Sequence, residues 1–135
     1  MPIDSDERTR PALTALATDV VCLVVFCTIG RRSHAEGLTL SGIAQTAWPF
    51  LTGAAVGWLV ARGWRRPVAV VPTGVVVWVC TIAVGMLLRR ATSQGVSASF
   101  VVVASLVTAL FLVGWRVVAA LMLRTRIRRR LGRSR

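Results

Sequence analysis

Asp19 and Arg116 are the residues with the clearest chemical potential, because they are the only charged residues inside four long apolar segments. A charge within a membrane span costs about 2.5–3.5 kcal/mol or more, so it usually has a function or a partner. At about 1.5 Å rise per helical residue, each lies roughly 10 Å inside the same membrane face. A hydrogen-bonded Asp–Arg pair would neutralise two charges that neither side chain could easily keep alone.

Three interpretations of this pair are open. In the first, the pair is a structural clamp between the first and last apolar segments, and small residues beside both positions favour close helix approach. In the second, the pair forms a polar functional site at a cavity facing the cytoplasm. In the third, Arg116 extends to a lipid phosphate while Asp19 is separately solvated or protonated.

The composition predicts that these residues are held by membrane helices. The chain has 135 residues, 55% of them hydrophobic, and its 16% of charged residues lie mainly between apolar blocks. Each block has about the 20 residues that a spanning helix needs, and a lone strand could not satisfy its backbone in hydrocarbon. We therefore expect an all-α membrane bundle of four transmembrane helices, with an N-terminal tail (1–11) and a basic tail (124–135). The expected spans cover residues 12–30, 43–61, 68–88 and 98–123.

The distribution of arginine predicts the orientation of this bundle. All 17 basic residues are Arg, and the two tails and the loop between the second and third spans hold most of them. The positive-inside rule therefore predicts a multi-pass protein of the plasma membrane with both termini in the cytoplasm. Membrane lipids are the expected partners, together with a homo-oligomer or a larger membrane complex, and nucleic acid is not expected.

The C-terminal tail is predicted to bind anionic lipid headgroups. We expect the last helix to continue along the cytoplasmic surface, because Leu123, Ile127 and Leu131 share one helical face. The alternative partners are RNA or an acidic protein. The basic residues of this lipid-binding tail are Arg124, Arg126, Arg128, Arg129, Arg130, Arg133 and Arg135.

The two outward loops form a candidate anion site from Arg31, Arg32, His34, Arg89 and Arg90. Guanidinium groups suit phosphate and carboxylate, although contact with lipid headgroups explains the same residues. The loops also resemble each other, because residues 31–41 align with residues 89–99 at a constant offset of 58. Either two helical hairpins are duplicated or the match is a coincidence in a sequence of low diversity.

Prolines and glycines mark two other features of the predicted helices. Pro49 and Pro72 each remove a helical hydrogen bond and are predicted to kink their helices, either for packing or to expose carbonyls for a transport site. Gly53 and Gly57 form a G-x-x-x-G step, which predicts close helix packing within the bundle or in a dimer.

The tryptophans divide between two expected environments. Trp48, Trp58 and Trp64 fit the aromatic belts at membrane interfaces. Trp115, beside Arg116, is expected to pack in the core.

The sequence contains no recognisable catalytic, cofactor or metal constellation, so we expect that the protein is not an enzyme. The leading hypothesis is a non-enzymatic small membrane or accessory protein that acts by association. The alternative is a small proton- or ion-coupled transporter using Asp19, although a neutralised carboxylate is a poor proton carrier. A third hypothesis is a lipid-handling protein that uses the outward arginine loops.

Several short sequence strings, together with Asp19, carry a resemblance to a known family. The chain resembles a family of small actinobacterial integral membrane proteins, classified as a domain of unknown function, and the resemblance runs from about Asp19 to Arg116. It implies a four-helix membrane protein and supplies no activity or catalytic residues. The strings are Ile29-Gly30-Arg31-Arg32-Ser33-His34, Thr46-Ala47-Trp48-Pro49-Phe50, Gly63-Trp64-Arg65-Arg66-Pro67, Gly85-Met86-Leu87-Leu88-Arg89 and Gly114-Trp115-Arg116.

Overall fold

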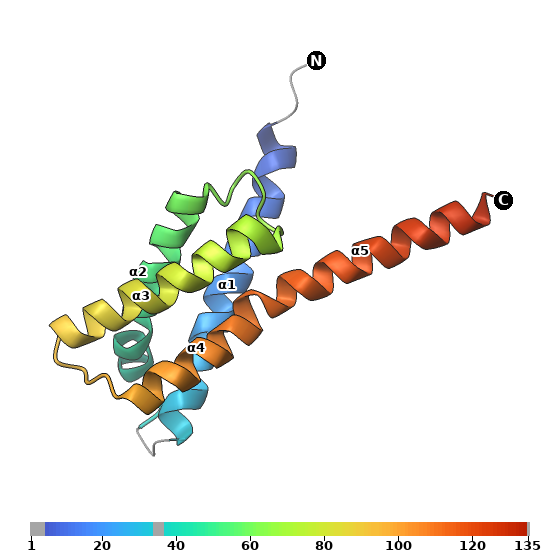
Figure 1. Ribbon diagram of the computed structural model, residues 1–135. Helices are drawn as coiled ribbons and strands as arrows, with labels where there is room; N and C mark the ends of the chain where they lie inside the picture. Colours follow the sequence, from blue (N-terminus) through green and yellow to red (C-terminus); the bar gives the residue numbers. More distant parts are fainter. Residues whose placement is uncertain (1–4, 34–36, 135) are drawn as a thin grey trace.

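The described part of the chain is an all-helical bundle, which confirms the predicted fold class (Figure 1). The structure is a computed structural model, and it describes residues 5–33 and 37–134. The elements in chain order are α1 (Ser5–Ser33), α2 (Leu40–Ala61), the short π-type element η1 (Val70–Gly74), α3 (Val75–Ala91), α4 (Ala98–Leu112) and α5 (Gly114–Arg133).

Within the described residues, three helical stretches are long and apolar enough to cross a membrane. They are Thr9–Ser33, Val70–Ala91 and Ala98–Arg133, and their most apolar windows have a mean hydropathy of 2.2. The segment predicted as the second span is helical, as α2, but it is not among these three. Its polar Gln45 and Thr46 lower its hydropathy, so its place in the membrane stays a prediction.

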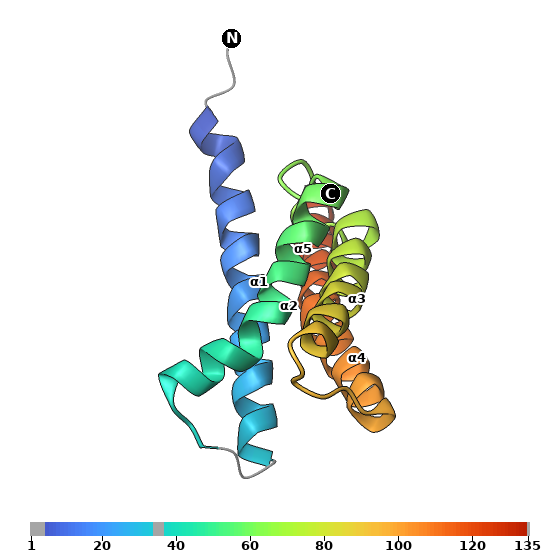
Figure 2. The same ribbon diagram turned by 90° about the vertical axis from the view of Figure 1, so that its left-hand side faces the viewer.

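Helices α1, α2, α3 and α4 run in alternating directions (Figures 1 and 2). The C-terminal end of α1 and the N-terminal end of α4 lie at one end of the bundle, and the start of α1 and the loop of residues 62–69 lie at the other (Figures 1 and 2). Helix α2 packs most extensively against α3, while α1 lies against α2 and α4. The two arginine loops predicted to share one membrane face therefore belong to the same end of the bundle.

Side-chain caps fix where two of the helices begin. The hydroxyl of Thr39 accepts a hydrogen bond from the Gly42 amide at 3.0 Å before α2, and the Ser97 hydroxyl accepts one from the Phe100 amide at 3.2 Å before α4. These bonds satisfy amides that have no partner within the helix.

The G-x-x-x-G step lies in the contact between α2 and α3. A Cβ atom on Gly53 would lie 2.7 Å from the Cys80 carbonyl oxygen, and one on Gly57 would lie 2.7 Å from the Val77 Cα atom. Only hydrogen atoms fit there, so these glycines set how closely the two backbones approach. Of the two predicted uses, the structure shows packing within the bundle.

The first helix begins earlier than the sequence predicts. Helix α1 starts at Ser5, so residues 5–11 are helical and not an irregular tail. Acidic Asp6 and Glu7 in its first turn complement the helix dipole, and Arg10 pairs with Asp6 at 2.9 Å. Pro11 lies inside this helix.

Both predicted proline kinks are present, with different local geometry. Pro49 lies inside α2, which bends along its length (Figure 2), as expected where a helical hydrogen bond is missing. Pro72 lies inside the helical stretch Val70–Ala91, which is kinked at Val71, where the backbone is extended (φ −122°, ψ 129°). Regular α-helix follows from Val75. A proline disfavours helical geometry at the residue before it, which accounts for the position of this kink.

The last predicted span and the basic tail form an almost continuous helical rod. Helices α4 and α5 are separated only by Val113, which keeps helical angles (φ −84°, ψ −39°). Helix α5 continues to Arg133 and leaves the bundle, ending far from the other helices (Figure 1). The predicted continuation of the helix is therefore present, while its contact with a membrane surface stays a prediction.

Candidate functional site

The structure brings Asp19 and Arg116 together in a bidentate ion pair. The Arg116 Nη2 atom lies 2.7 Å from Asp19 Oδ2, and Nη1 lies 2.8 Å from Oδ1. Both side chains are 0% exposed. Parallel guanidinium–carboxylate hydrogen bonds are the strongest form of this contact, and burial strengthens them further.

Two indole groups complete the coordination of the carboxylate. Trp58 donates its Nε1 hydrogen to Asp19 Oδ2 at 2.9 Å, and Trp115 donates its own to Oδ1 at 2.9 Å. Each oxygen of Asp19 therefore accepts one hydrogen bond from a guanidinium and one from an indole. A buried carboxylate with this set of donors is fully compensated for the loss of water.

The guanidinium of Arg116 also binds backbone carbonyls. Its Nε atom donates to the Pro67 carbonyl at 3.0 Å, and Nη1 donates to the Leu112 carbonyl at 2.8 Å. The Trp115 ring lies against the same group, with 4.5 Å between Arg116 Cζ and the ring centroid. The positive charge is thus held by a carboxylate, two carbonyl dipoles and an aromatic face.

Two glycines leave room for the side chains of this site. A Cβ atom on Gly63, just after α2, would lie 2.5 Å from the Trp58 ring, and one on Gly74 would lie 2.9 Å from Arg116 Cδ. The chain reverses direction at Arg62, which has left-handed angles (φ 50°), and the Gly63 amide donates to the Trp58 carbonyl at 2.9 Å. Gly63, at the start of the loop that carries Pro67, therefore lies against the Trp58 ring.

Sequence reasoning missed part of the site. The expectation that Trp58 belongs to an interfacial belt is wrong, because only 7% of it is exposed and its indole binds Asp19. Trp115 does lie against the core, but its polar nitrogen has the same acceptor. The recurrence of Val-Gly-Trp at residues 56–58 and 113–115 was the available signal, since it placed an indole in the second helix of each proposed hairpin, one residue out of step with the offset of 58.

The candidate outward anion site is realised only in part. Arg31 and Arg89 line one cavity of about 830 Å³, and Asp19 and Arg116 are not in its lining. Arg32 and Arg90 are exposed and do not line it. His34 lies outside the described residues.

Comparison with known proteins places this chain in a family. The profile described as "Protein of unknown function (DUF3054)" matches residues 16–119, a stretch that includes both members of the ion pair. The chain belongs to the DUF3054 family. No curated protein and no solved structure matches it. The actinobacterial source suggested by the sequence stays a prediction.

In this DUF3054 protein, the two outward loops repeat the same contacts at the offset of 58. Arg31 Nη2 donates to the Gly37 carbonyl at 2.9 Å, and Arg89 Nη2 donates to the Gly95 carbonyl at 3.3 Å. The helix caps described above, Thr39 and Ser97, are separated by the same offset. This agreement in geometry supports the predicted duplication of two helical hairpins.

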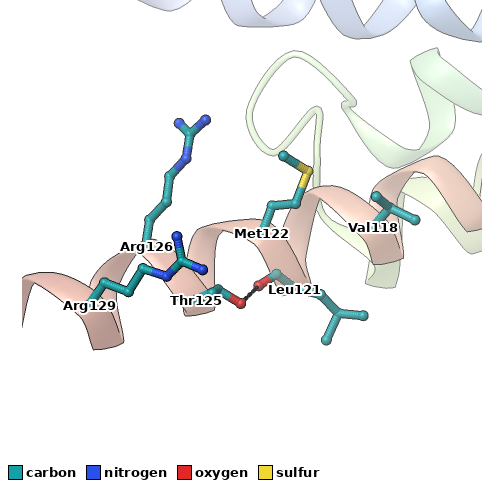
Figure 3. A pocket seen from close by; sticks show the side chains of 6 residues that line it. All are labelled: Val118, Leu121, Met122, Thr125, Arg126 and Arg129. Carbon is teal, nitrogen blue, oxygen red and sulfur yellow. Dashed lines mark hydrogen bonds between the residues drawn. The ribbon is translucent and has the colours of Figure 1, made fainter.

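The basic tail of this DUF3054 protein presents its charges to solvent. A shallow hollow of about 330 Å³ along α5 is lined by Val118, Leu121 and Met122 at one end and by Arg126 and Arg129 at the other (Figure 3). All of its lining residues lie on α5, so no other element encloses a ligand there. The exposed arginines on α5 are Arg124, Arg126, Arg128, Arg129, Arg130 and Arg133, and Arg135 lies outside the described residues.

Proposed function

We propose that this DUF3054 protein is a non-enzymatic integral protein of the plasma membrane that acts by association, as a small accessory subunit. The observation that carries the proposal is the burial and hydrogen bonding of Asp19. Asp19 is fully buried, paired with Arg116 and bound by two indoles. A group compensated in this way supports structure and has no vacant position for a substrate.

The surface of the apolar helices supports association. Only 28% of the most apolar window of Thr9–Ser33 is buried inside the protein, and 22% of that of Ala98–Arg133. In a membrane, this remaining surface meets either lipid chains or another protein. Small helical proteins with so much uncovered surface are suited to packing beside a larger partner or a second copy.

The alternative, a proton- or ion-coupled transporter, requires Asp19 to exchange its partners for water or a cation. Breaking one side of a buried ion pair costs about 3–5 kcal/mol, because the other charge is left without compensation. The hydrogen bonds at 2.7–2.9 Å around both oxygens therefore weigh against a carrier role.

Two measurements on the full chain test this proposal against the alternative. In a mild non-ionic detergent, native mass spectrometry should find assemblies heavier than the single 14.6 kDa chain. In proteoliposomes, the wild type should show no proton-linked flux that Asp19→Asn removes. A strictly monomeric protein with proton flux dependent on Asp19 would establish the transporter instead.

A further inference from the structure

The last turns of α5 form a free end that no other described element covers. Every residue from Leu121 to Ser134 is exposed. At about 1.5 Å per residue, the helical part of this free end, residues 121–133, extends roughly 20 Å. An isolated helix of this length is only marginally stable in water, so a surface that binds it would stabilise it.

Helix α5 leaves the bundle beside the loop of residues 62–69. The Arg116 Nε atom donates to the Pro67 carbonyl at 3.0 Å, which fixes the start of α5 next to this loop. The loop connects two predicted spans and carries exposed arginines, as expected at the border between hydrocarbon and headgroups. From there α5 slants away from α1, and its end lies to the side of the bundle (Figure 1). The free end therefore extends over the lipid that surrounds the bundle.

An apolar stripe runs along one side of the free end. Its members, at four-residue spacing, are Leu123, Ile127 and Leu131, and they are 60%, 50% and 64% exposed. The shallow hollow on α5 lies on the opposite side of the helix. Thr125 and Arg129 line that hollow, and each is two residues from Ile127, about 160° around the helix axis.

The apolar stripe faces away from the predicted cytoplasmic end of the bundle. Figure 3 shows Met122 and Arg126, which line the hollow, directed to the side of α5 on which the loop of residues 62–69 lies. The stripe, across the helix from the hollow, is turned toward the lipid. Apolar side chains placed in this way are stabilised among acyl chains.

The rest of the free end is positively charged. Arg124 and Arg130 border the apolar stripe, each about 60° from Ile127, and Arg129 lies across from it. The sequence contains no Asp or Glu after Glu36, so no carboxylate side chain of α5 neutralises these arginines. A narrow apolar stripe between arginines is typical of a helix that lies in a membrane interface, where the charged groups extend to lipid phosphates.

We propose that the free end of α5 binds the anionic phospholipid surface of the leaflet beside the loop of residues 62–69. The apolar stripe inserts between acyl chains, and the arginines contact phosphates. RNA or an acidic protein would use only the charges and would leave the stripe in water. This proposal is independent of whether the protein acts by association, because a monomer would bind the leaflet in the same way.

The test measures the depth of two positions on the full chain in lipid nanodiscs. A polarity-sensitive fluorophore is attached to Ile127→Cys, or to Thr125→Cys as the matched control on the opposite side, after the native cysteines are replaced by alanine. In nanodiscs of phosphatidylcholine and phosphatidylglycerol, lipids brominated in their acyl chains should quench the label at position 127. The label at position 125 should keep the emission it has in water.

Three results would overturn the proposal. Equal quenching at both positions would mean that the stripe does not orient the helix. Emission typical of water at both positions would leave RNA or an acidic protein as the partner. Unchanged quenching at position 127 in pure phosphatidylcholine would remove the requirement for anionic lipid.

Two exposed arginines test the charge contribution in the same nanodiscs. Arg128→Gln, on the free end, should lower the ratio of bound to unbound helix about fivefold, since each basic residue near an anionic surface contributes to binding. Arg10→Gln, on α1, removes an exposed arginine outside α5 and should leave the ratio unchanged. Equal effects of the two substitutions would show only a general attraction of the protein to anionic lipid, which would also overturn the proposal.

Discussion

Asp19 shows how one chain accommodates a carboxylate inside an apolar helix. Its two oxygens receive hydrogen bonds of 2.7–2.9 Å from Arg116, Trp58 and Trp115. Removing two charges from water costs several kcal/mol for each ion, and such a pair is tolerated only when the remaining donors and acceptors are also satisfied. The contributions of the indoles and the Pro67 carbonyl are therefore part of the clamp and not accessory to it.

The clamp predicts coupling between its two charged residues. Asp19→Asn should lower the free energy of unfolding by about 3–5 kcal/mol, because the Arg116 charge stays buried without its counterion. The double variant Asp19→Asn with Arg116→Gln should recover part of this loss, with a coupling of about 0.5–3 kcal/mol. Unfolding of the detergent-solubilised protein in increasing denaturant measures both quantities.

A surface ion pair in the same helix provides the control. Asp6 and Arg10 also approach to 2.9 Å, but their side chains are 64% and 79% exposed. Asp6→Asn should therefore change stability by only about 0–1 kcal/mol. If the losses from Asp19→Asn and Arg116→Gln were simply additive, the two residues would not act as a pair.

At the scale of elements, the close contact of α2 and α3 depends on glycine. Gly57→Ala should destabilise the protein by about 1–3 kcal/mol, because overpacking forces the helices apart. The new Cβ atom would lie 2.7 Å from the Val77 Cα atom, which belongs to backbone that cannot rotate away. Thermal unfolding followed by circular dichroism measures the change.

Gly30 in α1 is the matched control for this substitution, because a Cβ atom there meets nothing within 4 Å. Gly30→Ala should be neutral or stabilise the protein by up to about 1 kcal/mol, since alanine favours helix more than glycine does. Similar destabilisation by both substitutions would mean that the α2–α3 contact does not limit stability.

At the scale of the whole molecule, the arginine distribution predicts which end of the bundle faces the cytoplasm. In whole cells, a membrane-impermeant thiol reagent should label Ser93→Cys and should label Ser134→Cys only after permeabilisation. Both positions are exposed, and the native cysteines are buried or half-buried within apolar helices. The opposite labelling pattern would reverse the orientation.

The amino-acid sequence by itself determined the fold class and pointed to the charged pair. Apolar runs of spanning length leave the backbone no alternative to helices, and two buried charges of opposite sign at similar depth are most cheaply accommodated together. The continuation of the last helix was also predictable, because residues 124–133 contain no proline and only one glycine. These three features depend only on composition and on the spacing of residues along the chain.

Only the tertiary structure decided which other groups surround Asp19 and where the cavity lies. The convergence of Trp58 and Trp115 on one carboxylate depends on how each helix is rotated about its axis, and the hydropathy of a segment does not specify that rotation. The contact from Pro67 depends on the path of the loop after α2, which reverses at Arg62. Likewise, Arg31 lines the cavity and Arg32 does not, because neighbouring helical residues point about 100° apart. The physical reason is the same in each case: burial depends on the length and apolarity of a segment, while specific polar contacts depend on the relative placement of several segments.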